Sequence, residues 1–389
     1  MKRVLITAGP VYGRLDANKL VGNRSRGIWA LQLADTLAMQ GYLDGGDIFW
    51  VTLLVSDTFP KERISDYISR VAQPYVTVVR HTGFDDYREK CHQLAQENDY
   101  AVMASAVVNW IPKTPFPGKM PTHGYTVGDE ISIPFYLAPR VIEEMKAHNP
   151  NLTIIGCKML AGATDEDLIE AAYGVLLKSR CNVVVANDLS RGLRRKLLVY
   201  PDRSVHVYED DWQRFEAALV ALLNDKFWST KLSQDPMEDS VALAHARRLF
   251  DQIVDKNRSR FIHPMEGDSR VFGSLAVPVG ETAWLVSPRE KGGIFTSADA
   301  VLVNGISVSD RTVMVQGKTK ATLNAPLLVR MSAQYGHRAV LHLHEDHPMG
   351  ITVPYGPPGT DRDNSRDIPG PRINIEGHGF VAAINDKCG

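Results

Sequence analysis

The sequence predicts a two-domain protein: an α/β domain whose mostly parallel sheet carries helices on both faces, followed by an α+β domain. Its 389 residues exceed the size at which one hydrophobic core usually keeps growing. In the first half, β-branched apolar runs alternate with helical patterns, as in parallel sheets joined by crossover helices. In the second half, short strands surround a few helices, and no internal repeat occurs.

The first half is expected to contain strands at residues 3–7, 49–55, 75–79, 100–105, 152–156 and 182–186, with helices at about 27–40, 85–97, 139–147 and 165–178. Ligands of such sheets bind outside the carboxyl ends of the strands, where the polar strand tails of this chain converge. A long polar loop is expected between the first strand and the first helix. The Pro/Gly-rich residues 109–133 are too long for a plain connection and predict a functional flap.

A helix at residues 211–223 is expected to close the first half, and the polar residues 229–240 indicate a domain boundary. These limits give domains at 1–228 and 240–389. The second domain is expected to have helices at 241–255 and 324–335, with strands at 269–277, 283–287, 300–303, 312–316, 338–344, 371–375 and 380–384.

The composition excludes several classes of protein. Lys plus Arg (44) nearly balances Asp plus Glu (45), so no whole-chain field attracts nucleic acid or a membrane surface. The four cysteines lack metal-site or disulfide spacing, and no apolar run approaches a membrane span of about 18 residues. A cytoplasmic protein without nucleic-acid or membrane partners is expected.

The turn after the first strand is a candidate anion site. The strand ends at Gly9, and the loop that follows reaches Asn23, Ser25, Arg26 and Gly27 directly before a helix. Unpaired N–H groups and the helix dipole make such a place favourable for phosphate. Spacing alone is a weak signal, because the residues could equally serve packing and helix capping.

Five motifs, in order, resemble the phosphopantothenoylcysteine synthetase family over residues 1–225. The family's opening motif corresponds to residues 6–9, Asp16 and 21–27, and its next motif to residues 105–110. The flap lysine of the family corresponds to Lys119. The last two motifs correspond to residues 156–161 and 185–188.

The resemblance implies a Rossmann-like fold and a CTP-dependent ligation, in which a small carboxylic acid becomes an acyl cytidylate and then joins an amine. Asn23 and Lys119 would be catalytic. The implied nucleotide-binding residues are Gly9, Ser25, Arg26, Gly27, Ala106, Asn109, Gly156, Lys158, Asn187 and Asp188. Mg²⁺ usually accompanies a triphosphate. The chain departs from the family at Arg26 (Ser), Asn109 (Asp) and Leu160 (Glu).

Three histidines of the second half form a candidate metal site. His342 and His344 alternate on a predicted strand, so both point to one face, and His378 lies between two later strands. Such a set can bind Zn²⁺ or a similar divalent metal and leave one position open. Taken alone, the pattern is more often that of three unrelated polar histidines.

Residues 241–389 resemble the class II aldolase/adducin family in five places: residues 273–276, 287–290, 317–318, His342–His344 and 377–379. The resemblance implies that the three histidines hold a metal which polarises a hydroxycarbonyl substrate. Asn324 stands where the family has its acid/base Glu, and an amide cannot shuttle a proton. Some relatives are silent assembly modules.

Three hypotheses therefore stay open. The leading one is a CTP-dependent carbon–nitrogen ligase with a metal-binding second domain. The second is a metal-dependent aldolase, epimerase or dehydratase acting on a phosphorylated sugar, and the third is a catalytically silent assembly module. A homo-oligomer is expected in each case, because relatives of both halves form closed assemblies.

Overall fold

The protein is described from a computed structural model, which covers residues 2–43, 49–192, 194–261, 271–289, 291–293 and 295–384. The chain forms two compact units. The first comprises residues 1–201 and 206–223, and the second comprises residues 202–205 and 224–389. Each unit is described by itself. Among the described residues, no helix combines the length and the apolar character needed to cross a membrane.

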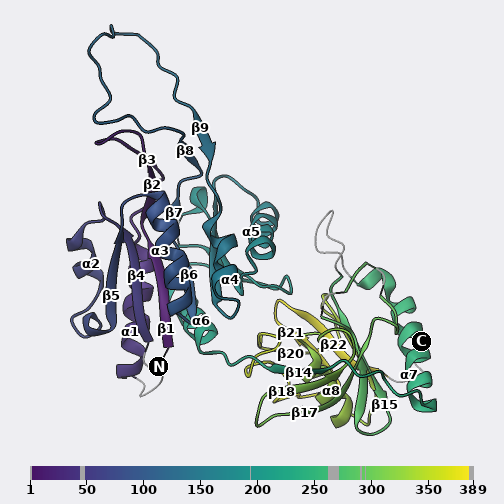
Figure 1. The fold of residues 1–389 in the computed structure, drawn as a ribbon. Helices are drawn as coiled ribbons and strands as arrows, with labels where there is room; N and C mark the ends of the chain where they lie inside the picture. Colours follow the sequence, from purple (N-terminus) through teal and green to yellow (C-terminus); the bar gives the residue numbers. More distant parts are fainter. Residues whose placement is uncertain are drawn as a thin grey trace. The chain divides into compact units, whose positions relative to one another are not determined.

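The first unit is built on an eight-stranded sheet in the order β13-β12-β11-β10-β6-β1-β4-β5 (Figure 1). The strands are β1 (Lys2–Ala8), β4 (Phe49–Ser56), β5 (Val76–His81), β6 (Tyr100–Met103), β10 (Thr153–Leu160), β11 (Val183–Asp188), β12 (Lys196–Val199) and β13 (Val205–Tyr208). The pairs from β5 to β11 are parallel, and β12 pairs with β11 in the antiparallel sense. This confirms the predicted α/β class.

Helices cover both faces of this sheet. One layer contains α1 (Ile28–Leu43), α2 (Lys61–Tyr67) and α6 (Trp212–Asn224), and the other contains α3 (Phe84–Glu97), α4 (Val141–His148) and α5 (Asp165–Ser179). The central strand β1 is buried from Val4 to Ala8, which explains its continuous apolar sequence. Each predicted strand and helix of this half is present, with bounds shifted by a few residues.

The prediction of one long polar loop after β1 was wrong. The segment contains β2 (Pro10–Arg14) and β3 (Leu20–Gly22), which join β7 (Ala106–Val107) in a three-stranded sheet. Single-sequence patterns miss such short strands, because their partners lie far away in the chain. The helix α2 was missed too.

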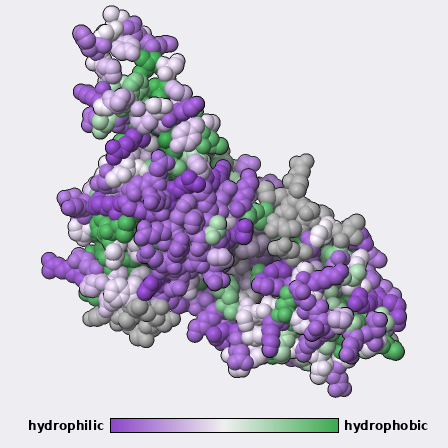
Figure 2. Space-filling view, viewed as in Figure 1, coloured by the Kyte–Doolittle hydropathy of each residue, from purple (hydrophilic) through white to green (hydrophobic). Residues whose placement is uncertain are grey.

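The predicted flap is an arm that extends beyond the ends of the strands (Figure 1). Its base is a hairpin of β8 (Trp110–Pro112) and β9 (Phe135–Leu137). The arm exposes Trp110, Val127 and Leu137, and Figure 2 shows apolar residues along it among hydrophilic ones.

The second unit is built on a nine-stranded, mostly antiparallel sheet in the order β14-β18-β17-β16-β15-β19-β22-β21-β20. The strands are β14 (Ser229–Ser233), β15 (Ser274–Val279), β16 (Ala283–Val286), β17 (Val301–Ser307), β18 (Thr312–Gln316), β19 (Ala339–Leu343), β20 (Ile351–Val353), β21 (Arg372–Ile375) and β22 (Gly379–Ile384). The start of the strand predicted at 269–277 lies outside the described residues. The polar segment 229–240, expected to be a domain boundary, begins with β14, which pairs with β18 inside the second unit.

The sheet of the second unit separates two hydrophobic clusters. Helix α7 (Val241–Lys256) packs with Leu275 and Leu341 on one side, and α8 (Ala325–Gln334) packs with Ala276 and Val340 on the other. Side chains alternate between the faces of a strand. His342 therefore lies on the α8 side, two residues after Val340.

Candidate functional site

The parallel strands of the first unit follow the order of a dinucleotide-binding sheet. Read along the sheet, β5-β4-β1-β6-β10-β11 corresponds to the order 3-2-1-4-5-6. The order reverses between β1 and β6, and ligands of such sheets bind in the crevice outside the carboxyl ends of these two strands. Gly9 follows β1 and Ala106 lies beyond β6, so both lie at this switch point.

Two glycines form a tight backbone cradle at the switch point. Gly9 has φ +77° and Gly27 has φ +66°. A Cβ atom on Gly27 would lie 2.9 Å from the backbone N of Gly9, and a Cβ atom on Gly9 would lie 2.6 Å from the Phe59 ring. Ser25 Oγ accepts a hydrogen bond from Gly27 N (3.3 Å). Only glycine fits both positions, and their backbones approach closely as a result.

The predicted catalytic amide lies beside this cradle. Asn23 Nδ2 donates to the carbonyl of Val107 (2.7 Å), and Ala106 N donates to the carbonyl of Gly9 (2.9 Å). The strands β2 and β7 pair in parallel, with Pro10 opposite Ala106. The structure therefore brings Gly9, Asn23, Gly27 and Ala106 together, although they are up to 97 positions apart in the sequence.

The arm is tied to the β2–β3 turn on both sides of Lys119. Ala17 N donates to the carbonyl of Gly118 (2.8 Å), and Met120 N donates to Asp16 Oδ2 (2.8 Å). The Asp16 side chain is buried and accepts two further backbone N–H groups of its own turn. These bonds, led by that of Met120, hold the pKa of Asp16 below its usual value. Lys119 itself is exposed.

Further predicted residues lie near the carboxyl ends of the parallel strands. Asn109 is exposed at the arm base, where its carbonyl accepts from Ala138 N (2.8 Å). Lys158 lies on β10, and burial together with the nearby Arg140 lowers the pKa of its amine. Asn187 lies on β11, and its buried Nδ2 has no hydrogen-bond partner in the described part of the chain. Lys158 is opposite Ala186 and Asn187 is opposite Met159, so the two side chains leave the sheet on opposite faces, and a ligand that lies across the strand ends would contact both.

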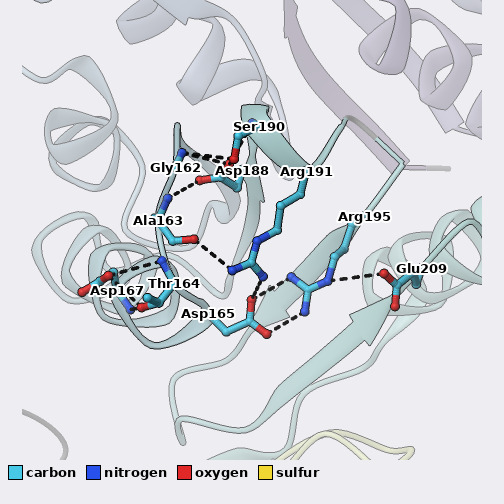
Figure 3. Close-up of polar contacts among 10 residues, drawn as sticks. All are labelled: Gly162, Ala163, Thr164, Asp165, Asp167, Asp188, Ser190, Arg191, Arg195 and Glu209. Carbon is cyan, nitrogen blue, oxygen red and sulfur yellow. Dashed lines mark hydrogen bonds and ion pairs between the residues drawn. The ribbon is translucent and has the colours of Figure 1, made fainter.

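Two predicted residues have clear structural roles. Gly156 is buried in β10, where a Cβ atom would lie 3.0 Å from Cys181 Sγ and 3.2 Å from Ile142. Asp188 accepts hydrogen bonds from the N–H groups of Gly162 (3.1 Å) and Ala163 (2.8 Å) and from Ser190 (Figure 3). These bonds lower the pKa of the Asp188 carboxyl, with the Ser190 hydroxyl making the largest contribution.

The Asp188 loops are braced further by Asp165 at the start of α5. Arg195 donates to both carboxylate oxygens of Asp165, and Arg191 donates to the same carboxylate (Figure 3). Arg191 also donates to the carbonyl of Ala163 (3.0 Å). The strand-end loops after β10 and β11 are thus fixed to each other by charged hydrogen bonds.

The three predicted histidines meet in the second unit. The ring centroid of His342 lies 4.8 Å from that of His344 and 4.5 Å from that of His378. One nitrogen from each ring can be chosen so that all three lie within 4.8 Å of one another. His342 Nδ1 lies 3.1 Å from the carbonyl of Phe380, and its buried Nε2 has no hydrogen-bond partner among the described residues. The three histidines could bind a divalent metal through unprotonated ring nitrogens.

The electrostatics of this centre favour neutral imidazoles. Burial lowers the pKa of His342 well below its usual value and that of His344 to about 3, and the neighbouring His378 acts in the same direction. Asp202 Oδ2, in the segment 202–205 of the same unit, lies 2.9 Å from His378 Nδ1. Metal-binding histidines commonly donate their second nitrogen to a carbonyl or carboxylate, as His342 and His378 could here.

Sequence reasoning missed the segment that follows β4. Phe59 packs against both cradle glycines, and Arg63 of α2 donates to the carbonyl of Arg26 (3.4 Å). The only signal in the sequence is Pro60, the N-cap residue of the seven-residue helix that carries Arg63.

Asn324 is the N-cap residue of α8, without a side-chain capping bond. Glu290 of the second resemblance lies outside the described residues.

The first unit thus has a Rossmann-like sheet with a glycine cradle at its switch point, which defines a class of α/β domains suited to phosphate-bearing ligands. Residues 1–216, more than half of the chain, match the DNA/pantothenate metabolism flavoprotein C-terminal domain family, and the protein belongs to this family. The match falls on the part whose motifs resemble the phosphopantothenoylcysteine synthetases.

Known proteins similar to this chain match it only partly. The coenzyme A biosynthesis bifunctional protein CoaBC of Methanocaldococcus jannaschii is 24% identical over 190 residues, which are 49% of this chain and 41% of that protein. The chain therefore spans about two fifths of the length of that relative. The crystal structure of the DNA/pantothenate metabolism flavoprotein from Streptococcus pneumoniae is 16% identical, with a TM-score of 0.48, over 58% of this chain and 99% of that one.

A different solved structure resembles a shorter part of the chain. YgbL of Klebsiella pneumoniae, a putative aldolase/epimerase/decarboxylase, is 14% identical and covers 37% of this chain and 81% of its own, with a TM-score of 0.28. This likeness is too distant to assign a family to the second unit, whose candidate site consists of the three histidines.

Proposed function

We propose that the first unit is a CTP-dependent ligase that joins a small carboxylic acid to an amine. In the first step, a carboxylate oxygen bonds to the α-phosphorus of CTP, the bond to the β-phosphate oxygen breaks, and pyrophosphate leaves with the electron pair. In the second step, the amine attacks the acyl carbon, CMP leaves, and the amine proton is lost. The observation that carries this proposal is the meeting of Gly9, Asn23, Gly27 and Ala106 at the switch point of a family member.

The first step needs fixed donors and cations, because negative charge moves onto phosphate oxygens. The backbone N–H group of Gly9 and the hydroxyl of Ser25, whose Oγ already accepts from Gly27 N, would bind the triphosphate. Arg26 would add positive charge at the loop. Lys119 would contact the α-phosphate when the arm bends toward the cradle, because its neighbours are bonded to the turn at the far end of β2 from Gly9.

The second step needs a donor for the oxygen on the acyl carbon. The Nδ2 group of Asn23 has two N–H donors, of which one is used by the Val107 carbonyl, so one remains for the intermediate. The nucleotide would lie along the edge from Ala106 and Asn109 to the ends of β10 and β11. Lys158 and Asn187 are proposed to contact the nucleotide there, while Gly156 and Asp188 would shape the strand ends behind them. Mg²⁺ would neutralise charge on the phosphates.

Pyrophosphate release tests the ligase. The protein would be incubated with each of the four nucleoside triphosphates, Mg²⁺ and acid–amine pairs, beginning with phosphopantothenate and cysteine. CTP-dependent pyrophosphate release is expected in the unchanged protein and in Lys113→Ala, a matched control in the arm. We expect release to fall about 100-fold in Lys119→Ala. Absence of nucleotide binding by calorimetry would remove the proposal.

We propose a metal centre in the second unit as a second function, because three mostly buried histidines converge there and His342 Nε2 has no hydrogen-bond partner in the part of the chain that the structure describes. A divalent ion at this centre would polarise a hydroxycarbonyl group. Asn324 offers no proton, so either another group moves the proton or the centre serves assembly.

Elemental analysis of the purified protein tests the metal centre. About one zinc or similar ion per chain is expected, and the His342→Ala/His344→Ala variant is expected to lose it. His245→Ala is the matched control, because this residue lies on the helix α7 outside the cluster. A protein without any bound divalent metal, even after incubation with excess zinc, would contradict the centre.

A further inference from the structure

The segment between β4 and α2 brings an arginine to the rim of the glycine cradle. The Phe59 ring is in contact with both glycines, because a Cβ atom would lie 2.6 Å from it on Gly9 and 3.0 Å from it on Gly27. The guanidinium carbon of Arg63 lies 5.5 Å from the centroid of this ring. Arg63 Nη1 also donates to the carbonyl of Arg26 (3.4 Å). The position of Arg63 is therefore set by the residues that form the cradle.

The turn at residues 56–59, between β4 and α2, is held in place by the neighbouring strand β5. Arg80 on β5 donates through Nη1 to the carbonyls of Ser56 (3.0 Å), Asp57 (3.3 Å) and Phe59 (2.9 Å). Phe59 N donates to the carbonyl of Ser56 (3.1 Å), which closes the turn. The turn that leads into α2 is thus rigid, and Arg63 lies in the first turn of this helix, so fixing its guanidinium on a ligand costs little additional entropy.

The arginines near the cradle are not paired with carboxylates of the described residues. Within the described ranges, no carboxylate forms an ion pair with Arg24, Arg26 or Arg63, whereas other arginines have such partners: Arg88, Arg191, Arg195, Arg258, Arg260 and Arg362. A guanidinium presents a planar set of donors that matches phosphate oxygens. The Arg63 guanidinium lies against Phe59 and Arg26, next to a helix start of the kind that favours an anion.

We propose that Arg63 is a phosphate-binding residue that acts on the two terminal phosphates of the nucleoside triphosphate. This assignment rests on the proposed ligase. Arg63 would bind the β- and γ-phosphates through the donors that do not face Arg26. When the bond between the α-phosphorus and the β-phosphate oxygen breaks, these donors would stabilise the charge that develops on pyrophosphate. The site would then select triphosphates over monophosphates.

Calorimetry with CTP, CDP and CMP, each with Mg²⁺, tests this role in the full-length protein. In Arg63→Gln we expect CTP binding to weaken about 10- to 100-fold and CMP binding to stay unchanged. Arg63→Lys should retain part of the CTP affinity, because it keeps the charge but not the fork of donors. Arg70→Gln is the matched control, an exposed arginine three positions beyond the end of α2.

The outcomes separate the two proposals. If the unchanged protein binds none of the three nucleotides, the ligase proposal fails and the role of Arg63 fails with it. If the unchanged protein prefers CTP and Arg63→Gln keeps the same ratio of CTP to CMP affinity, only the role of Arg63 is refuted. Urea denaturation of Arg63→Gln shows whether the variant is folded, and equal CMP binding is a second check on the cradle.

Discussion

Replacing Gly9 by alanine is the sharpest test of the cradle. The φ of +77° places an alanine in the left-handed region, which costs about 1–2 kcal/mol. The new Cβ atom would also lie 2.6 Å from two carbons of the Phe59 ring, and such overpacking costs about 1–3 kcal/mol. We therefore expect Gly9→Ala to destabilise the first unit by about 2–5 kcal/mol.

The control for the backbone cost is Gly280→Ala. Gly280 has φ +69° in the turn between β15 and β16, and a Cβ atom there would have no neighbour within 4 Å. This variant should destabilise only the second unit, by about 1–2 kcal/mol. Urea denaturation followed by hydrogen exchange of β1 and β15 peptides reports the two units separately.

A double-mutant cycle isolates the contact with the ring. Phe59→Ala removes the ring, so the Gly9→Ala change should cost about 1–3 kcal/mol less in that background than alone. The left-handed cost should remain. The reasoning is refuted if Gly9→Ala costs no more than Gly280→Ala, or if removal of the ring brings no relief.

Three further predictions follow from single contacts. Asp16→Asn should weaken the hydrogen bond from Met120 N that anchors the arm, and it should lower ligase turnover about 10- to 100-fold. The control Asp129→Asn changes a turn within the arm and should leave turnover unchanged. Equal turnover in both variants would contradict a role of the Asp16 anchor in catalysis. Burial lowers the pKa of His81 from 6.5 to about 4, and the folded state therefore favours the neutral ring. The first unit should lose about 3 kcal/mol of stability as the pH falls from 6.5 to 4, and His81→Gln should flatten this slope in urea titrations. His342→Ala alone should release the bound metal, and a full equivalent retained at neutral pH would argue against this ligand.

Local sequence determined most of the regular elements. β1 and the neighbouring parallel strands are continuous apolar runs because both of their faces are buried, and such runs are visible without any knowledge of partners. His342 and His344 share a face because strand side chains alternate, which follows from spacing alone. The glycines at positions 9 and 27 were also predicted, because a strand end before a helix is a recognisable anion site.

Other features needed the tertiary structure, because they depend on contacts between distant segments. β2 and β3 are too short to be recognised without β7, and Phe59 and Arg63 become part of the cradle only through the packing of α2. Asp188 reads like a ligand-binding residue, yet its acceptors are filled by the loop of Gly162. The sequence alone thus determined which apolar segments form the main strands and helices, since this depends on neighbouring residues. Which strand ends meet, and which polar atoms remain free for a ligand, was decided only by the fold.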